Sequence, residues 1–324
     1  MRRFFGRAPG SPDTGAPAHR AAPAGMGPRA TTERDLLLAG RIAAFEVARR
    51  ERIRSLADIE LRVGSQCGGE GFIGWLGARL PDIPRRFVEF GVETYEQANT
   101  RFVMANRGWR GLIIDSGDGH LAATRGPAWR HDLTAAVGFV TAENIDGLIR
   151  ANGFAGEIGL LGVDIDGNDY WVLKAIESVR PWIIVCEMNA VFGDRHAITV
   201  PYRPDFDRQA AHFSRLYFGA SVVALTELCA GKGYRFIGSA SSGVNAFFVR
   251  DDVAGPVLSA IDVVRAWPSH HRESLDAEGR KTLIRGPARA DVIAALPVVD
   301  VRTGATVPLG SLAPLYSEAW LADM

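Results

Sequence analysis

Acidic residues follow several apolar runs of the sequence, at the points where these runs end. Glu89 and Gly91 lie in the run RFVEFGV (86–92), and Asp115 ends the next run, WRGLIID. A carboxylate placed roughly 20 residues beyond the first strand of a nucleotide-binding fold can accept hydrogen bonds from both ribose hydroxyls. The first turn carries no G-x-G-x-x-G, which favours a nucleoside without a pyrophosphate. We therefore predict that Glu89, Gly91 and Asp115 bind a nucleoside-containing cofactor, Gly91 by letting the backbone approach it.

Two later apolar runs supply a second group of acids. EIGLLGVDID (157–166) ends with Asp164 and Asp166, and PWIIVCEMN (181–189) contains Glu187. Isolated carboxylates are costly to bury, so these side chains must be solvated, paired or bound to a cation. Their oxygens could hold a hard cation such as Mg²⁺, or they could act as a general base toward a hydroxyl. Both hypotheses use the same three residues.

The polar segment after the fifth apolar run, residues 190–218, is the expected place for an acceptor. It is rich in Arg, Asp, His and aromatic side chains, which suits a polyhydroxylated molecule. His196 and His212 are candidate bases there, with a solvated loop residue and a half-buried helix residue as the respective alternatives. Asn245, in GVNAFF, is expected either at the ligand edge or in a turn.

Hydrophobic patterning predicts the elements that would position these groups. Strands that are apolar almost throughout alternate with helices, which indicates a parallel sheet covered on both faces. In such a sheet, ligands bind beyond the carboxyl ends of the strands. A Ser/Gly turn inside 234–250 predicts an antiparallel hairpin. The predicted strands are 86–92, 109–115, 135–140, 157–166 and 181–189, and the predicted helices are 95–108, 142–153, 168–179 and 219–233.

Composition divides the chain further. The Pro/Gly/Ala-rich residues 1–30 predict a disordered leader, and 31–63 an accessory helix. We expect a Rossmann-like domain over 64–255 and a small C-terminal extension over 256–324, with a hairpin across Thr303 and Gly304.

The whole-chain numbers exclude several classes of protein. Lys and Arg number 37, as do Asp and Glu, so the chain lacks the electrostatic footprint of a nucleic-acid-binding protein. No stretch approaches the apolar length of a membrane-spanning helix, and no apolar segment of a secretory signal follows the basic N-terminus. Three scattered cysteines indicate a reducing compartment, so we expect a cytoplasmic protein. The oligomeric state is left open.

Three blocks of the sequence resemble the FkbM-type family of S-adenosylmethionine (SAM)-dependent methyltransferases. They are FVEFGVETYEQANTRFVMANRGWRGLIID, LLGVDIDGNDYWVLKAI, and the stretch from YFGASVVALTEL to GYRFIGSASSGVNAFFVR; GSQCGGEGFIGWL upstream is also similar. The resemblance covers residues 64–250. It implies a class I methyltransferase sheet, mostly parallel with a terminal antiparallel hairpin, and O-methylation of a hydroxyl on a sugar, glycolipid or secondary metabolite.

The resemblance also implies roles for individual residues. Glu89 and Gly91 match the first cofactor motif, Asp115 matches the ribose acid, and Asp164 and Asp166 match the acidic edge near the methyl donor. One position departs from the family pattern, because Glu93 stands where the cofactor loop usually has its second glycine.

Two other functions remain open on the residues alone. Asp164-Ile-Asp166 also suits a metal-dependent nucleotide-sugar glycosyltransferase, although Glu89 and Asp115 have no natural place in that scheme. Glu93 motivates a second alternative, a non-catalytic Rossmann-fold binding protein.

Overall fold

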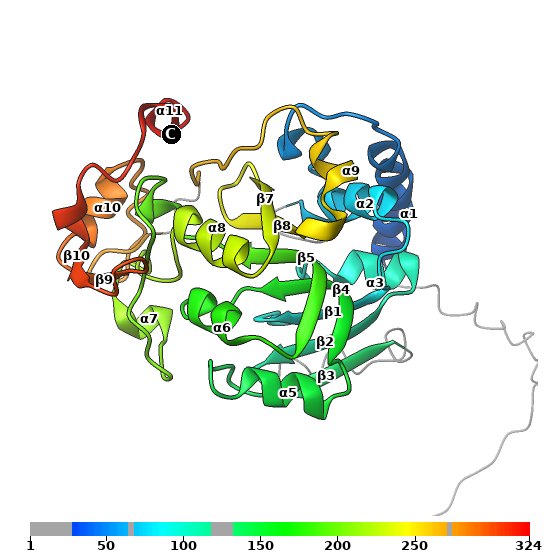
Figure 1. Cartoon of the computed structure of the whole chain (residues 1–324), viewed down its shortest axis with the longest axis horizontal. Coiled ribbons are helices and arrows are strands. Elements are labelled where there is room, and N and C mark those ends of the chain that lie inside the picture. The colour runs from blue at the N-terminus through cyan, green and yellow to red at the C-terminus, as the bar shows by residue number, and fades with distance from the viewer. Residues whose placement is uncertain (1–27, 64–67, 118–131, 271–273) are drawn as a thin grey trace, which may run out of the picture.

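The computed structural model describes residues 28–63, 68–117, 132–270 and 274–324, and its main feature is one large sheet (Figure 1). The seven strands of this sheet are β1 (Arg86–Phe90), β2 (Arg110–Asp115), β3 (Leu133–Val137), β4 (Gly156–Val163), β5 (Val179–Glu187), β7 (Tyr234–Ser239) and β8 (Asn245–Arg250). Their spatial order is β3-β2-β1-β4-β5-β8-β7. Strands β1 to β5 are parallel to one another, whereas β8 is antiparallel to both β5 and β7. The mostly parallel sheet with a terminal antiparallel hairpin is therefore confirmed.

Side chains of the strands alternate between two apolar layers, as the pleat requires. On β1, Val88 and Phe90 belong to one layer and Phe87 to the other. The first layer packs under α5 (Ile145–Ala151), α6 (Asp169–Ala175) and α8 (Val222–Gly231). The second lies under α1 (Pro28–Ala48), α2 (Gly69–Arg79), α3 (Arg101–Arg107) and α9 (Gly255–Leu258) (Figure 1). Both faces are covered, which explains why the strands are apolar almost throughout.

The N-terminal segments differ in part from the sequence expectations. Residues 1–27 of the predicted leader lie outside the described residues, as do 64–67, and residues 28–30 already belong to α1. The helix expected over 95–108 begins only at Arg101, and it ends at Gly108, which has a left-handed conformation with φ of 64°. Helix α3 starts late because the Glu89 carboxylate on β1 accepts hydrogen bonds from the N–H groups of Asn99 and Thr100, the two residues before Arg101.

The C-terminal residues extend the molecule on the side of α7 (Arg208–Ala211) and α8 (Figure 1). The predicted hairpin is present as β9 (Pro297–Asp300) and β10 (Thr306–Pro308). Strand β9 also pairs with β6 (Ile198–Thr199), which makes a second, three-stranded sheet. The short helices α10 (Ala288–Val292) and α11 (Glu318–Ala322) complete this part. Elsewhere and here, short 3₁₀ turns connect the elements: η1 (Leu56–Ile59), η4 (Ala190–Phe192), η5 (Asp251–Val253) and η6 (Leu309–Leu312).

Within the described part of the chain, none of the helices combines the length and the apolar character needed to cross a bilayer.

Candidate active site

Three of the predicted catalytic residues meet at the carboxyl edge of the sheet. Val163 is in register with Cys186, so Asp164 emerges from β4 beside Glu187 at the end of β5. One carboxylate oxygen from each of Asp164, Asp166 and Glu187 lies within 4.8 Å of the other two. The topology thus assembles a compact acidic cluster from the segment just after β4 and the last residue of β5.

Burial is the main influence on the pKa values of Asp164 and Glu187. It raises the pKa of Asp164 well above its usual range, and the charges of Asp166 and Asp169 raise it further. The pKa of Glu187 is raised in the same way, first by burial and then by the charge of Asp164. One carboxylate oxygen of Asp164 lies within 4.8 Å of one of Glu187. Two carboxyls that interact so closely titrate as a pair, so together they hold a proton more readily than either would alone.

Arg208 covers the acidic cluster from α7. Its Nη1 pairs with Asp166 and lies 3.9 Å from Oε1 of Glu187, while its Nε donates to the Arg215 carbonyl at 2.9 Å. Its guanidinium lies 3.7 Å from the ring centroid of Phe218. Sequence reasoning missed this residue, because a single arginine in a polar segment has no spacing signal. Arg208 supplies positive charge at the position where a cation had been hypothesised.

Two buried oxygens beside the cluster lack partners among the described residues. Glu187 is in register with Asn245 across β5 and β8, and directly opposed residues of antiparallel strands share a face. Both are buried, at 7% and 4% exposure, yet Oε2 of Glu187 and Oδ1 of Asn245 accept no hydrogen bond. Buried polar atoms are rarely left without a partner. The pair therefore suits a ligand that donates hydrogen bonds, such as a hydroxyl.

Glu89 holds the loop that leads into α3. Its Oε1 accepts from the backbone N–H and the side-chain amide of Asn99, at 3.0 and 3.2 Å. Its Oε2 accepts from the N–H and the hydroxyl of Thr100, at 3.1 and 2.5 Å. Burial raises the pKa of this carboxyl, and the four hydrogen bonds oppose that shift. These bonds fix the chain just before Arg101, which is why α3 starts late; a direct contact of Glu89 with a cofactor stays a prediction.

The turn after β1 requires glycine at Gly91 for a reason beyond cofactor approach. Gly91 has φ of 74°, and a Cβ there would lie 1.4 Å from the carbonyl oxygen of Asp164. Glu93 also adopts positive φ, 46°, and its side chain is exposed. The glutamate therefore keeps the left-handed backbone that glycine favours, and its side chain does not fill the interior of the loop.

Asp115 ties together the turns that follow β1 and β2. One carboxylate oxygen accepts from the N–H of Glu93 at 2.9 Å, and the other from the N–H of Gly117 at 2.9 Å. A carboxylate offers about four lone-pair positions, so acceptor capacity remains for two more donors. The side chain is only partly buried. This donor-accepting edge fits the two hydroxyls of a ribose.

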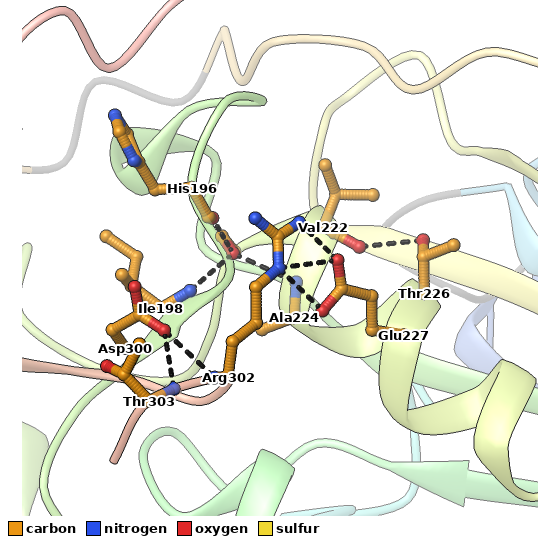
Figure 2. A network of polar contacts seen from close by, with 10 residues as sticks. His196, Ile198, Val222, Ala224, Thr226, Glu227, Asp300, Arg302 and Thr303 are labelled. Carbon is orange, nitrogen blue, oxygen red and sulfur yellow. Dashed lines mark hydrogen bonds and ion pairs between the residues drawn. The ribbon is translucent and has the colours of Figure 1, made fainter. Parts of the chain in front are cut away.

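His196 is not a member of the acidic cluster among the described residues. Its ring Nε2 lies 3.2 Å from the Pro314 carbonyl in the C-terminal segment, and its own carbonyl accepts from the Ser221 hydroxyl at 2.7 Å. Figure 2 shows the ring pointing out of the surrounding network, in which Arg302 pairs with Glu227. His196 thus contacts the C-terminal segment, and its catalytic role stays a prediction. The other candidate, His212, bonds through Nδ1 to the Ser214 hydroxyl at 2.8 Å, and burial lowers its pKa.

Comparisons with known proteins point to one family. Residues 76–235 match the family model described as the methyltransferase FkbM domain. No curated protein matches the chain. Among solved structures, an O-methyltransferase from Bacillus cereus in complex with SAH is similar at 16% identity and a TM-score of 0.38, over 69% of this chain and 91% of that one. The CurJ carbon methyltransferase is similar at 10% identity and a TM-score of 0.36, over 68% of this chain and 70% of that one.

Proposed function

Because this chain belongs to the FkbM methyltransferase family and is a SAM-dependent methyltransferase, we propose that it methylates a hydroxyl group of a sugar, glycolipid or secondary metabolite. Family membership selects methyl transfer over the glycosyltransferase and non-catalytic alternatives. The observation that carries the hydroxyl acceptor is the pair of buried, unpartnered oxygens on Glu187 and Asn245. These oxygens require hydrogen-bond donors, and an acceptor hydroxyl is one.

The carboxyl edge of the sheet divides into a cofactor side and an acceptor side. Asp115 would hold the ribose hydroxyls, since its two oxygens keep acceptor capacity at the end of β2. Gly91 and Glu89 shape the adjacent turn. Bound SAM supplies an activated methyl group on a sulfonium sulfur. The chain must then orient the acceptor hydroxyl and exclude water, and such positioning can account for much of the rate.

Glu187 is the residue best placed to receive the proton of the hydroxyl. Its unpartnered Oε2 accepts the hydrogen bond, and its coupling to Asp164 raises its proton affinity toward that needed of a general base near neutral pH. Arg208, 3.9 Å from Oε1, stabilises the carboxylate form of Glu187, the form that can accept the proton. Asp164 and Asp166 support this step through their effect on Glu187, and His196 is the alternative base.

Magnesium is an alternative partner for Asp164, Asp166 and Glu187, whose oxygens are chemically suited to it. The guanidinium of Arg208 pairs with two of the three acids, so a metal ion would have to displace it. We therefore expect activity to persist in EDTA. If EDTA instead abolishes activity and added Mg²⁺ restores it, the acidic cluster is a metal site.

The proposed cellular setting is the cytoplasm. Cys186 and Cys229 are free, buried thiols, as expected for a reducing compartment.

Calorimetric titration of S-adenosylhomocysteine (SAH) into the purified protein tests the cofactor assignment. We expect micromolar binding, and an Asp115→Ala variant should bind about 10-fold to 100-fold more weakly, because hydrogen bonds to a charged group are lost. Asp82→Ala, which changes an exposed aspartate outside the site, is the matched control. A folded protein that does not bind SAH would refute the proposal. Equal SAH affinities of the Asp115→Ala and Asp82→Ala variants would show that Asp115 does not bind the ribose.

A further inference from the structure

Arg289 carries an uncompensated charge on the C-terminal extension. It lies on α10 and is only partly exposed. Its Nη1 donates to the Ser269 carbonyl at 3.4 Å, and its buried Nε has no acceptor among the described residues. No carboxylate of the described residues pairs with it, and burial lowers its pKa. A guanidinium that is desolvated without a counterion is unfavourable and calls for an anion.

The fold places Arg289 on the acceptor side of the molecule. Helix α10 packs against η4, the turn that begins three residues after Glu187. The Tyr316 hydroxyl donates to the Val191 carbonyl of that same turn at 2.8 Å. The charge of Arg208 acts on Arg289 as a repulsion and lowers its pKa. Arg289 therefore lies near Arg208, the arginine that pairs with the acidic cluster.

The two arginines differ in how their charges are balanced. Arg208 pairs with Asp166 and lies near Glu187, so its charge is neutralised within the chain. Arg289 repels Arg208 and has no such partner among the described residues. An anion bound by Arg289 would remove both its own uncompensated charge and this repulsion.

We propose that Arg289, supported by Arg208, binds a carboxylate or phosphate group carried by the acceptor. The acceptor is then a hydroxylated anion, such as a uronic acid or a sugar phosphate. The guanidinium fork matches both groups, because two parallel N–H donors face two oxygens. This inference rests on the proposed function, because it assigns a negative charge to the methyl acceptor whose hydroxyl gives its proton to Glu187.

Calorimetry with three probes tests the charge of the ligand. D-Glucuronate, glucose 6-phosphate and uncharged glucose are titrated into the full chain, with and without SAH. We expect at least one anion to bind about ten-fold or more tightly than glucose, the difference that hydrogen bonds to a charged group supply. The preferred anion distinguishes a carboxylate site from a phosphate site. Equal binding of all three probes, or no binding of either anion, overturns the inference.

Variants then locate the site. Arg289→Gln should bring anion binding down to the level of glucose, whereas Arg285→Gln, an exposed arginine four residues earlier, should leave it unchanged. Arg289→Lys keeps the charge but loses the fork, so we expect intermediate binding; this variant carries the test if the glutamine variant does not fold. Wild-type anion binding by Arg289→Lys and Arg289→Gln would overturn the assignment. Because SAH is titrated separately, failure of anion binding alone leaves the methyltransferase proposal standing, and failure of SAH binding alone removes that proposal.

Discussion

Asp164 and Glu187 share a site in which two full negative charges are unfavourable, and this coupling defines the chemistry at the residue scale. Burial raises the pKa of each carboxyl, the charge of Asp164 raises the pKa of Glu187 further, and the charge of Asp166 raises both. An ordinary surface glutamate is too weak a base for a hydroxyl near neutral pH, and a raised pKa brings it closer to the useful range. Gly91 contributes by allowing the Asp164 carbonyl to approach the turn after β1.

Glu187→Gln keeps the size of the side chain but removes the proposed base. We expect methyl transfer from labelled SAM to the acceptor to fall about 10²-fold to 10⁴-fold, the usual contribution of a positioned base. SAH binding should change little. Glu177→Gln, an exposed site two residues after the end of α6, is the control. Retention of full transfer by Glu187→Gln would shift the base to Asp164 or His196.

Asp169 gives the folded protein a pH-dependent stability. The carboxyl is fully buried and accepts from the N–H groups of Ile165 and Gly167, and burial raises its pKa from 3.8 to about 6. The folded state therefore binds this proton more tightly than the unfolded state. The stabilisation is complete below the unfolded pKa and is lost as the pH rises through about 6, in total about 3 kcal/mol.

Urea unfolding of wild type and Asp169→Asn between pH 4 and pH 7 checks this expectation. The wild-type free energy of unfolding should fall more steeply across that range than that of the variant, which has no titrating group at this position. Parallel curves for the two proteins would show that Asp169 does not carry the pH dependence.

At the scale of elements, the loop between β1 and α3 depends on one carboxylate from the strand below it. Glu89 accepts the N–H groups of Asn99 and Thr100, which stand directly before the helix and have no acceptors of their own within it. Hydrophobic spacing over 95–108 predicts a longer helix, because periodicity contains no information about these hydrogen bonds from a distant strand. The strands were predictable for the opposite reason: burial on both faces makes each of them apolar along its length.

Glu89→Gln replaces an acceptor with an amide that donates on one side. At least one of the backbone N–H groups then loses its partner inside the protein, so we expect the free energy of unfolding to fall by about 1–3 kcal/mol. SAH binding should weaken as well, because the loop also places Glu93 against Asp115. Urea denaturation and calorimetry measure the two effects. Glu96→Gln, exposed in the same loop, should behave as wild type.

For the whole molecule, sequence patterning predicts the central sheet and its terminal hairpin, but it does not predict how the C-terminal residues join them. The pairing of β6 with β9 links residues about a hundred positions apart, and no local signal encodes it. The same holds for Arg208, which reaches the acidic cluster only through tertiary packing of α7. Asp164, Asp166 and Glu187 could be grouped from the sequence, because parallel strands bring their carboxyl ends to one edge.

Two kinds of contact attach the C-terminal extension to the domain, and their magnitudes differ. Trp320, at 4% exposure, belongs to the apolar layer that includes α8, whereas the Arg302–Glu227 pair in Figure 2 is largely exposed. Removing a buried aromatic costs about 3–5 kcal/mol, while exposed ion pairs add little. We therefore expect Trp320→Ala to lower the urea midpoint strongly and Arg302→Gln to leave it nearly unchanged. The reverse order would mean that the extension is held by its ion pair. High salt should then lower the urea midpoint of the wild type, whereas attachment by apolar contacts keeps high salt from lowering it.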